Sequence, residues 1–185
     1  MNTFKELLSL KTRSPEWKNA WKLVAPQNLV ILQKEPFGGT GPYHLEEVFH
    51  WIFCSWKKET SSDSDNWTQS NPSWGQCAIT AMMLHKLFRD QEPVEIQNCR
   101  AHLPDGRNIS HYAPMLLESQ TRLDFTEIQF PTGTIFTDWI TKIGNEENGW
   151  NCVAMASEQT RMRYEKLLDS TNLWLASAVY KLLGT

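Results

Sequence analysis

The chain has 185 residues, a formal net charge of −3 at pH 7 and 41% hydrophobic residues. That length is enough to bury a substantial core and suits one domain with at most an appendage. Lysine and arginine are scattered rather than clustered, which argues against a nucleic-acid binder. No apolar run approaches the roughly 20 residues of a membrane span, and the N-terminal stretch lacks the apolar region of a secretory signal, so we expect a cytoplasmic protein.

The four cysteines are Cys54, Cys77, Cys99 and Cys152, and no pair of them has a CxxC spacing. In a cytosolic chain we expect such cysteines to stay reduced. Zinc sites need clustered ligands, and the sequence shows no such cluster. We therefore predict neither a bound metal nor a cofactor.

Two short helices are predicted near the N-terminus, over 3–11 and 15–24. Ser14 is placed to cap the second helix, and Pro15 suits its first position. The apolar run "NLVILQKEP" favours a short strand, and the glycine-rich "FGGTGPY" that follows is typical of a linker. We predict a helical appendage over 1–42 that precedes the main domain over 43–185.

Three helical segments are predicted in the main domain. Over 44–56, "HLEEVFHWIFCSW" repeats apolar residues at the three- and four-residue spacing of an amphipathic helix. After a polar loop, a second helix is predicted over about 74–89. The C-terminal segment 157–183 is predicted to be helical, with Ser157 as its N-cap and an interruption at "DSTN".

From residue 94 the apolar period changes to two, which is the period of a strand. "VEIQNCRAHLPDGRNISHYAPML" reads as two strands joined by a Pro-Asp-Gly turn, and "TRLDFTEIQF" as a third strand. "GTIFTDWITKIGNEENGW" is predicted to be a loop or a short-helix region. Antiparallel strands that follow a helix predict an α+β fold.

The stretch "NPSWGQCAITA" (71–81) predicts a helix start that carries a cysteine. Ser73 is placed as the N-cap, and Gln76 completes a capping box. Cys77 then falls in the first helical turn, where the helix dipole favours a thiolate. Gly75 allows the tight backbone approach that this geometry needs. A backbone N–H or the Gln76 side-chain amide is placed to stabilise an oxyanion. An ordinary small core residue fits the same position, so a nucleophile needs partners.

A cysteine nucleophile needs a base within hydrogen-bond reach and a group that orients the base. Of the five histidines, His85 lies two helical turns after Cys77, about 12 Å along the axis, which is too far for a direct bond. His111 lies within a predicted strand and Asp124 on the next one, so a cross-strand pair can lock the imidazole tautomer. The alternative is a strand histidine bonded to backbone and an unrelated strand-edge carboxylate.

Three segments carry a family resemblance: "SWKKETSSDSDNWTQSNPSWGQCAITAMML", "ISHYAPMLLESQTRLDFTEIQF" and "TRMRYEKLL". In this order, and over about 46–168, they resemble the YunG-like family of small bacterial proteins. The G-Q-C-A-x-T-A and D-x-T-x-x-Q-F pieces are the most specific. The chain departs from the family pattern at Ala113 and Pro114, where H-Y-W-N is replaced by "HYAP".

The resemblance implies a fold and a set of roles. Cysteine on a helix, histidine on a strand and aspartate on the next strand is the order of papain-like and transglutaminase-like folds. It implies Cys77 as nucleophile, His111 as base and Asp124 as orienter. The remaining implied site residues are Gly75, Gln76, Thr126 and Gln129 as supporting groups, and Trp74 and Tyr112 in a substrate groove.

We therefore expect a cysteine-dependent hydrolase or acyltransferase that forms a thioacyl intermediate on an amide, ester or related acyl bond. Deamidation of a protein glutamine would use the same chemistry. The expected substrate is a small molecule or a protein or peptide acyl group, with no nucleic acid and no membrane as partner. The alternative is a non-catalytic pseudo-enzyme that binds a small ligand or a partner protein.

Overall fold

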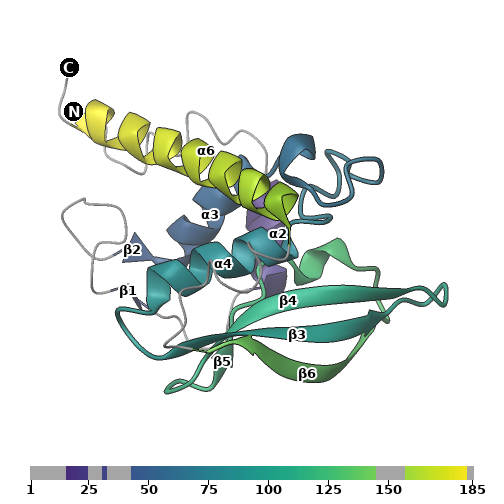
Figure 1. Ribbon diagram of the computed structural model, residues 1–185. Coiled ribbons are helices and arrows are strands. Elements are labelled where there is room, and N and C mark those ends of the chain that lie inside the picture. The colour runs from purple at the N-terminus through teal and green to yellow at the C-terminus, as the bar shows by residue number, and fades with distance from the viewer. Residues whose placement is uncertain (1–15, 25–30, 33–42, 145–156, 183–185) are drawn as a thin grey trace.

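The computed structural model describes residues 16–24, 31–32, 43–144 and 157–182. In chain order the elements are α2 (Glu16–Val24), β1 (Ile31–Leu32), β2 (Tyr43–His44), α3 (Leu45–Ser55), η1 (Lys58–Thr60), α4 (Cys77–Phe88), β3 (Val94–His102), β4 (Asn108–Leu116), β5 (Thr121–Arg122), η2 (Glu127–Gln129), β6 (Ile135–Ile143) and α6 (Glu158–Leu182). The helices lie on one side of a curled antiparallel sheet of strand order β5-β4-β3-β6 (Figure 1). The predicted mixed α+β class is confirmed. The helix predicted over 3–11 lies outside the described residues.

The core is centred on α3, where the predicted helix is confirmed. It is not amphipathic as predicted, because His50, Trp51 and Ser55 are buried as well as the predicted apolar positions. The Phe49 ring is fully buried, with ring centroids 5.4 Å from Trp21 of α2, 5.1 Å from Phe125 and 6.2 Å from Trp56. Such tilted and edge-on aromatic contacts stabilise a core beyond the area they bury. Trp21 therefore joins the same core as the rest of the fold, while the predicted domain boundary at 42/43 stays a prediction.

The predicted hairpin is confirmed as strands β3 and β4. The Leu103 N–H donates to the Arg107 carbonyl at 2.8 Å across the turn, where Gly106 has φ 86. A positive φ of this kind is reached readily only by glycine, so the Pro-Asp-Gly sequence determines the turn. His111 of β4 lies directly opposite Cys99 of β3 in the register.

Two predictions about the sheet are wrong. The third strand ends at Arg122 and not beyond Phe125, because the Asp124 carboxylate accepts the Thr126 N–H at 3.2 Å and turns the chain away. The segment predicted as loop or short helix contains β6, which pairs with β3. Asp138 has φ 59 within β6, and the register shifts beside it, so the alternation of the strand is broken.

Two predicted helix boundaries are also wrong. Helix α6 runs without a break through "DSTN", because Thr171 is fully buried against Ser55 of α3 and Met83 of α4, so tertiary packing holds this turn in the helix. Helix α4 begins at Cys77 and not near 74, because the preceding turn places Gly75 at φ 71. Within the described residues, no helix combines the length and apolar character needed to cross a membrane.

Candidate active site

Cys77 is the first residue of α4 and is 9% exposed. The N-cap is Gln76, whose side chain makes no capping hydrogen bond. The predicted capping box is therefore wrong: the Ser73 hydroxyl donates to Asn71 Oδ1 at 3.1 Å instead. Since the first N–H groups of a helix lack intrahelical acceptors, the backbone beside the Cys77 thiol presents donors to a ligand.

His111 and Asp124 form a buried pair. His111 Nε2 lies 2.5 Å from Asp124 Oδ2, and the imidazole is 0% exposed. The residues that sequence reasoning pairs are thus in contact, but Asp124 reaches His111 from the loop after β5 and not from a strand. Because Nε2 is used by Asp124, Nδ1 is the ring nitrogen left to exchange a proton with another group.

The Asp124 carboxylate is held on both of its oxygens. While Oδ2 contacts His111, Oδ1 accepts hydrogen bonds from the Thr126 N–H and the Thr126 hydroxyl, both at 3.2 Å. A carboxylate that accepts several hydrogen bonds is held in one orientation. Thr126 therefore lies where a supporting residue is predicted.

Gln129 joins the loop before α4 to the histidine. Its Oε1 accepts the Gly75 N–H at 3.1 Å, and its Nε2 donates to the Thr126 carbonyl at 2.9 Å and lies 3.5 Å from His111 Nδ1. The Asn71 side chain donates to the Gln129 carbonyl at 2.9 Å. These bonds link the loop before α4 to the loop after β5, next to His111.

The charge of the pair follows from these contacts. Burial by itself lowers the pKa of the His111 imidazole, but the charge and hydrogen bond of Asp124, with a smaller contribution from Cys77, raise the pKa to about 10. His111 is therefore an imidazolium at neutral pH. A thiol beside an imidazolium is the arrangement that stabilises a thiolate.

An aromatic wall encloses the imidazole. The ring centroids of Phe130, Phe136 and Trp139 lie 4.9, 5.6 and 6.1 Å from that of His111. Sequence reasoning gives these residues no role, because two of them belong to β6, which it does not predict. Phe130 ends the D-x-T-x-x-Q-F motif, and this motif is the one sequence signal for a residue of the aromatic wall. The wall keeps water from the His111–Asp124 bond, which strengthens it.

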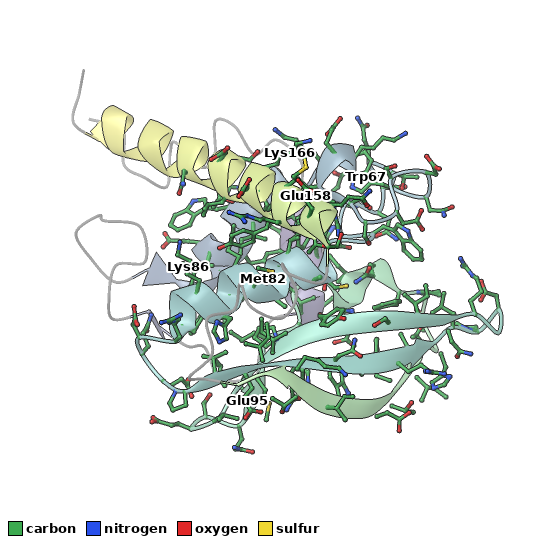
Figure 2. The ribbon with its side chains drawn as sticks, viewed as in Figure 1. Trp67, Met82, Lys86, Glu95, Glu158 and Lys166 are labelled. Carbon is green, nitrogen blue, oxygen red and sulfur yellow. The ribbon has the colours of Figure 1, made fainter. Side chains whose placement is uncertain are left out.

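A groove of about 380 Å³ opens beside Cys77. It lies between the segment before α4 and the start of β4, and its lining residues are Ser62, Asp63, Trp74, Gly75, Cys77, Arg107, Asn108, Ile109, Ser110 and Gln129. Trp67 lies on the same segment (Figure 2), and its indole N–H donates to the Pro72 carbonyl at 2.9 Å. The indole N–H of Trp74 donates to Asp63 at 2.9 Å, so hydrogen bonds within the segment before α4 hold this wall of the groove together.

Tyr112, predicted for the groove, and Gln76, predicted as a supporting group, do not line the groove. Tyr112 is half-buried and packs against the hydrophobic core. Gln76 is fully buried, and its Nε2 donates to the Lys57 carbonyl at 2.9 Å. The Gln76 amide therefore holds the preceding loop, and the first backbone N–H groups of α4 are the donors next to Cys77.

The other two described cysteines, Cys54 and Cys99, have thiols of raised pKa. Burial, together with the negative charge of Asp124, raises the pKa of the Cys99 thiol to about 12. Burial raises the pKa of Cys54 to about 11. Both thiols are neutral near pH 7 and therefore poor nucleophiles. Cys152 lies outside the described residues.

Arg163 of α6 is a charged residue near the site to which sequence reasoning assigns no role. Its Nη2 donates to the Thr160 hydroxyl at 2.8 Å, while its buried Nη1 has no hydrogen-bond partner among the described residues. Burial lowers the pKa of Arg163, and the charge of Cys77 acts in the opposite direction. The family resemblance of "TRMRYEKLL" is the one sequence signal that includes this arginine.

Fold and site together define a mixed α+β protein in which a cysteine lines a groove between a helix start and a sheet edge, with a buried histidine–aspartate pair next to that cysteine. Residues 44–173 match the YunG protein family, and the chain belongs to that family. No curated protein and no solved structure matches the chain.

Proposed function

We propose that this chain is a cysteine-dependent hydrolase or acyltransferase with a papain-like or transglutaminase-like core. Cys77 is the nucleophile, His111 the acid and base, and Asp124 the group that orients the histidine. The observation that carries the proposal is the buried His111–Asp124 pair beside a cysteine that lines an open groove. A cysteine with an oriented imidazolium next to it is the arrangement of nucleophilic thiol catalysis.

In the first half of the reaction, the Cys77 thiolate attacks the carbonyl carbon of an amide or ester. The carbonyl oxygen takes the electron pair and accepts hydrogen bonds from the first N–H groups of α4. As the tetrahedral intermediate collapses, His111 Nδ1 gives its proton to the leaving amine or alcohol. A thioester on Cys77 and a neutral His111 remain.

In the second half, water or an acceptor amine gives a proton to His111 Nδ1 and attacks the thioester. The C–S bond breaks, the acyl group leaves as an acid or a transferred amide, and the thiolate–imidazolium pair is restored. Asp124 keeps the ring oriented throughout, because its Oδ2 holds Nε2 and Thr126 fixes its Oδ1.

Alkylation by iodoacetamide tests the proposal. At pH 6.5 we expect Cys77 to react at least about tenfold faster than N-acetylcysteine, because an ordinary thiol with a pKa near 8.5 is about 99% protonated there. Cys77→Ala should remove the fast phase, whereas Cys54→Ala, which removes a thiol of raised pKa, should leave it. Peptide mapping by mass spectrometry identifies the labelled cysteine.

Two results would count against the proposal. One is a Cys77 rate no higher than that of N-acetylcysteine, and the other is labelling spread equally over Cys54, Cys77 and Cys99. Either result favours the alternative, a binding module that has kept the groove without a reactive thiol.

A further inference from the structure

The outer edge of β4 is open along the groove. On this side β4 pairs only with the two-residue strand β5, through Met115 with Arg122 and Leu116 with Thr121. One more bond follows, from the Leu123 N–H to the Pro114 carbonyl at 2.9 Å. No described strand pairs with this edge of β4 from Asn108 to Tyr112.

The direction of each main-chain group on β4 follows from the ladder. Successive residues of a strand point their N–H and C=O groups alternately to one neighbouring strand and to the other. The Leu103–Arg107 hydrogen bond is the first between β3 and β4 after the turn. By this alternation, the main-chain N–H and C=O groups of Ile109 and His111 also face β3. The groups of Ser110 then face the open edge, the same edge at which the Pro114 carbonyl accepts its bond from Leu123.

This open edge is also a wall of the groove that contains Cys77. Asn108, Ile109 and Ser110 line it on one side, opposite Trp74 and Gly75. Ser110 is the residue before His111, so a chain paired with Ser110 passes directly beside the reacting side chains. On the opposite wall, the Gly75 main chain is already used, because its carbonyl accepts the Ser62 N–H at 2.9 Å and its N–H is bonded to Gln129.

A second hollow of about 420 Å³ lies over the face of the sheet beside this edge. It shares Asn108 and Ser110 with the groove, and its other lining residues, on β3 and β6, are Asn98, Cys99, Arg100, Asp138 and Ile140. Both hollows have polar groups among their walls, whereas pockets for compact small molecules are mostly apolar. Within the groove, the main-chain donor and acceptor of Ser110 match an extended chain that has its own N–H and C=O groups.

We propose that the substrate is an extended peptide segment that adds to the open edge of β4, with one residue bonded to both the N–H and the C=O of Ser110. This inference rests on the proposed function, since it names the substrate class of the same site. Strand addition supplies affinity from main-chain hydrogen bonds and leaves side chains to select the sequence. The peptide carbonyl that follows the paired residue is presented to Cys77.

The wild-type chain and a synthetic probe test this pairing. The probe is acetyl-Ala-Ala-Ala chloromethyl ketone, compared with analogues N-methylated at one amide at a time and with iodoacetamide. Each rate of Cys77 alkylation is divided by the rate of the same reagent with N-acetylcysteine. We expect the unmethylated peptide to exceed iodoacetamide on this scale, and one N-methyl position to lower the rate about 5- to 10-fold, as one lost hydrogen bond does.

A matched pair of variants tests the Ser110 main chain directly. Ser110→Pro removes the outward N–H without touching the bonds to β3, and Pro114 already occupies an equivalent edge position. Ser110→Ala removes the hydroxyl, which accepts a bond from Asn98 at 2.8 Å, but keeps the N–H. We expect the ratio of peptide to iodoacetamide rates to be about fivefold lower in Ser110→Pro than in Ser110→Ala.

The outcomes separate this inference from the proposed function. One outcome overturns the peptide assignment and leaves Cys77 as the nucleophile. In that outcome iodoacetamide alkylates Cys77 fast, the peptide probe reacts no faster than iodoacetamide on the normalised scale, and no N-methyl group lowers its rate. Slow iodoacetamide alkylation overturns the proposed function, and the peptide assignment with it. If Ser110→Pro does not fold, the N-methyl series on the wild-type chain decides between these outcomes.

Discussion

Asp124→Asn is the substitution that probes the site most directly. Asp124 accepts hydrogen bonds on both oxygens, from His111 on one side and from Thr126 on the other. Asparagine has one acceptor oxygen, so its NH₂ group must face either the Thr126 N–H or His111 Nε2. If it faces Nε2, the ring proton moves to Nδ1 and the histidine takes the wrong tautomer to act as a base.

The expected loss follows from the charge of His111. Without the Asp124 carboxylate, no interaction of comparable strength offsets the lowering of the His111 pKa by burial. We therefore expect this pKa to fall from about 10 to its ordinary 6.5 or lower. At pH 7.5 less than about a tenth of an imidazole with that pKa is protonated. We expect Cys77 alkylation in Asp124→Asn to be at least about tenfold slower than in the wild type at pH 7.5. The defect should shrink toward pH 5.5, where His111 regains its proton.

Iodoacetamide rates measured from pH 5.5 to 9, with peptide mapping of Cys77, give this comparison. Asp65→Asn is the control, because it makes the same chemical change on an exposed residue of the loop before α4. A rate for Asp124→Asn within about twofold of wild type at pH 7.5, in a protein with an intact circular dichroism spectrum, would refute the electrostatic account.

Two further predictions concern stability. In Gly75→Ala, the new Cβ would lie 2.5 Å from Ser61 Oγ and 2.9 Å from Ser62 N at φ 71, whereas in Gly106→Ala at φ 86 it would meet nothing within 4 Å. Urea unfolding should show a loss at least about 1 kcal/mol larger for Gly75→Ala, and equal losses would contradict the clash. The raised pKa of His111 stabilises the fold fully below about pH 6.5, and this stability is lost as the pH rises through about 10. The melting temperature should therefore fall more steeply from pH 7 to 10 in wild type than in His111→Gln, and parallel curves would contradict this sign.

Local signals are sufficient for the elements that can be predicted. The three- and four-residue apolar spacing of α3 lies within one helix, and Pro104, Asp105 and Gly106 specify a turn by their own conformational limits. The strand β6 escapes prediction because Asp138, at φ 59, interrupts the alternation that would have shown it. Helix α6 is predicted as two pieces because the packing of Thr171 against Ser55 and Met83, far away in sequence, does not appear in a propensity pattern.

The sequence predicts which residues form the site better than it predicts how they are arranged in space. The sequence pairs His111 and Asp124 as strand neighbours, yet the contact is made by a loop whose position depends on the Leu123 N–H bonding to the Pro114 carbonyl. Gln76 is expected in the site, but its amide bonds to the Lys57 carbonyl, which lies far away in sequence. Such contacts depend on tertiary packing, which no local pattern encodes.

The hydrogen bonds of Gln129 determine when, during synthesis of the chain, the surroundings of Cys77 are complete. Gln129 bonds to Gly75, and the Asn71 side chain bonds to Gln129, so the loop before α4 is completed by residues that are synthesised more than fifty positions later. Under the proposed mechanism, Cys77 acquires its reactive environment only after the hairpin and the loop that follows it have left the ribosome and docked. The same mechanism makes the alkylation rate of Cys77 a measure of tertiary folding, and it leaves the nascent chain without a reactive thiol until the groove has formed.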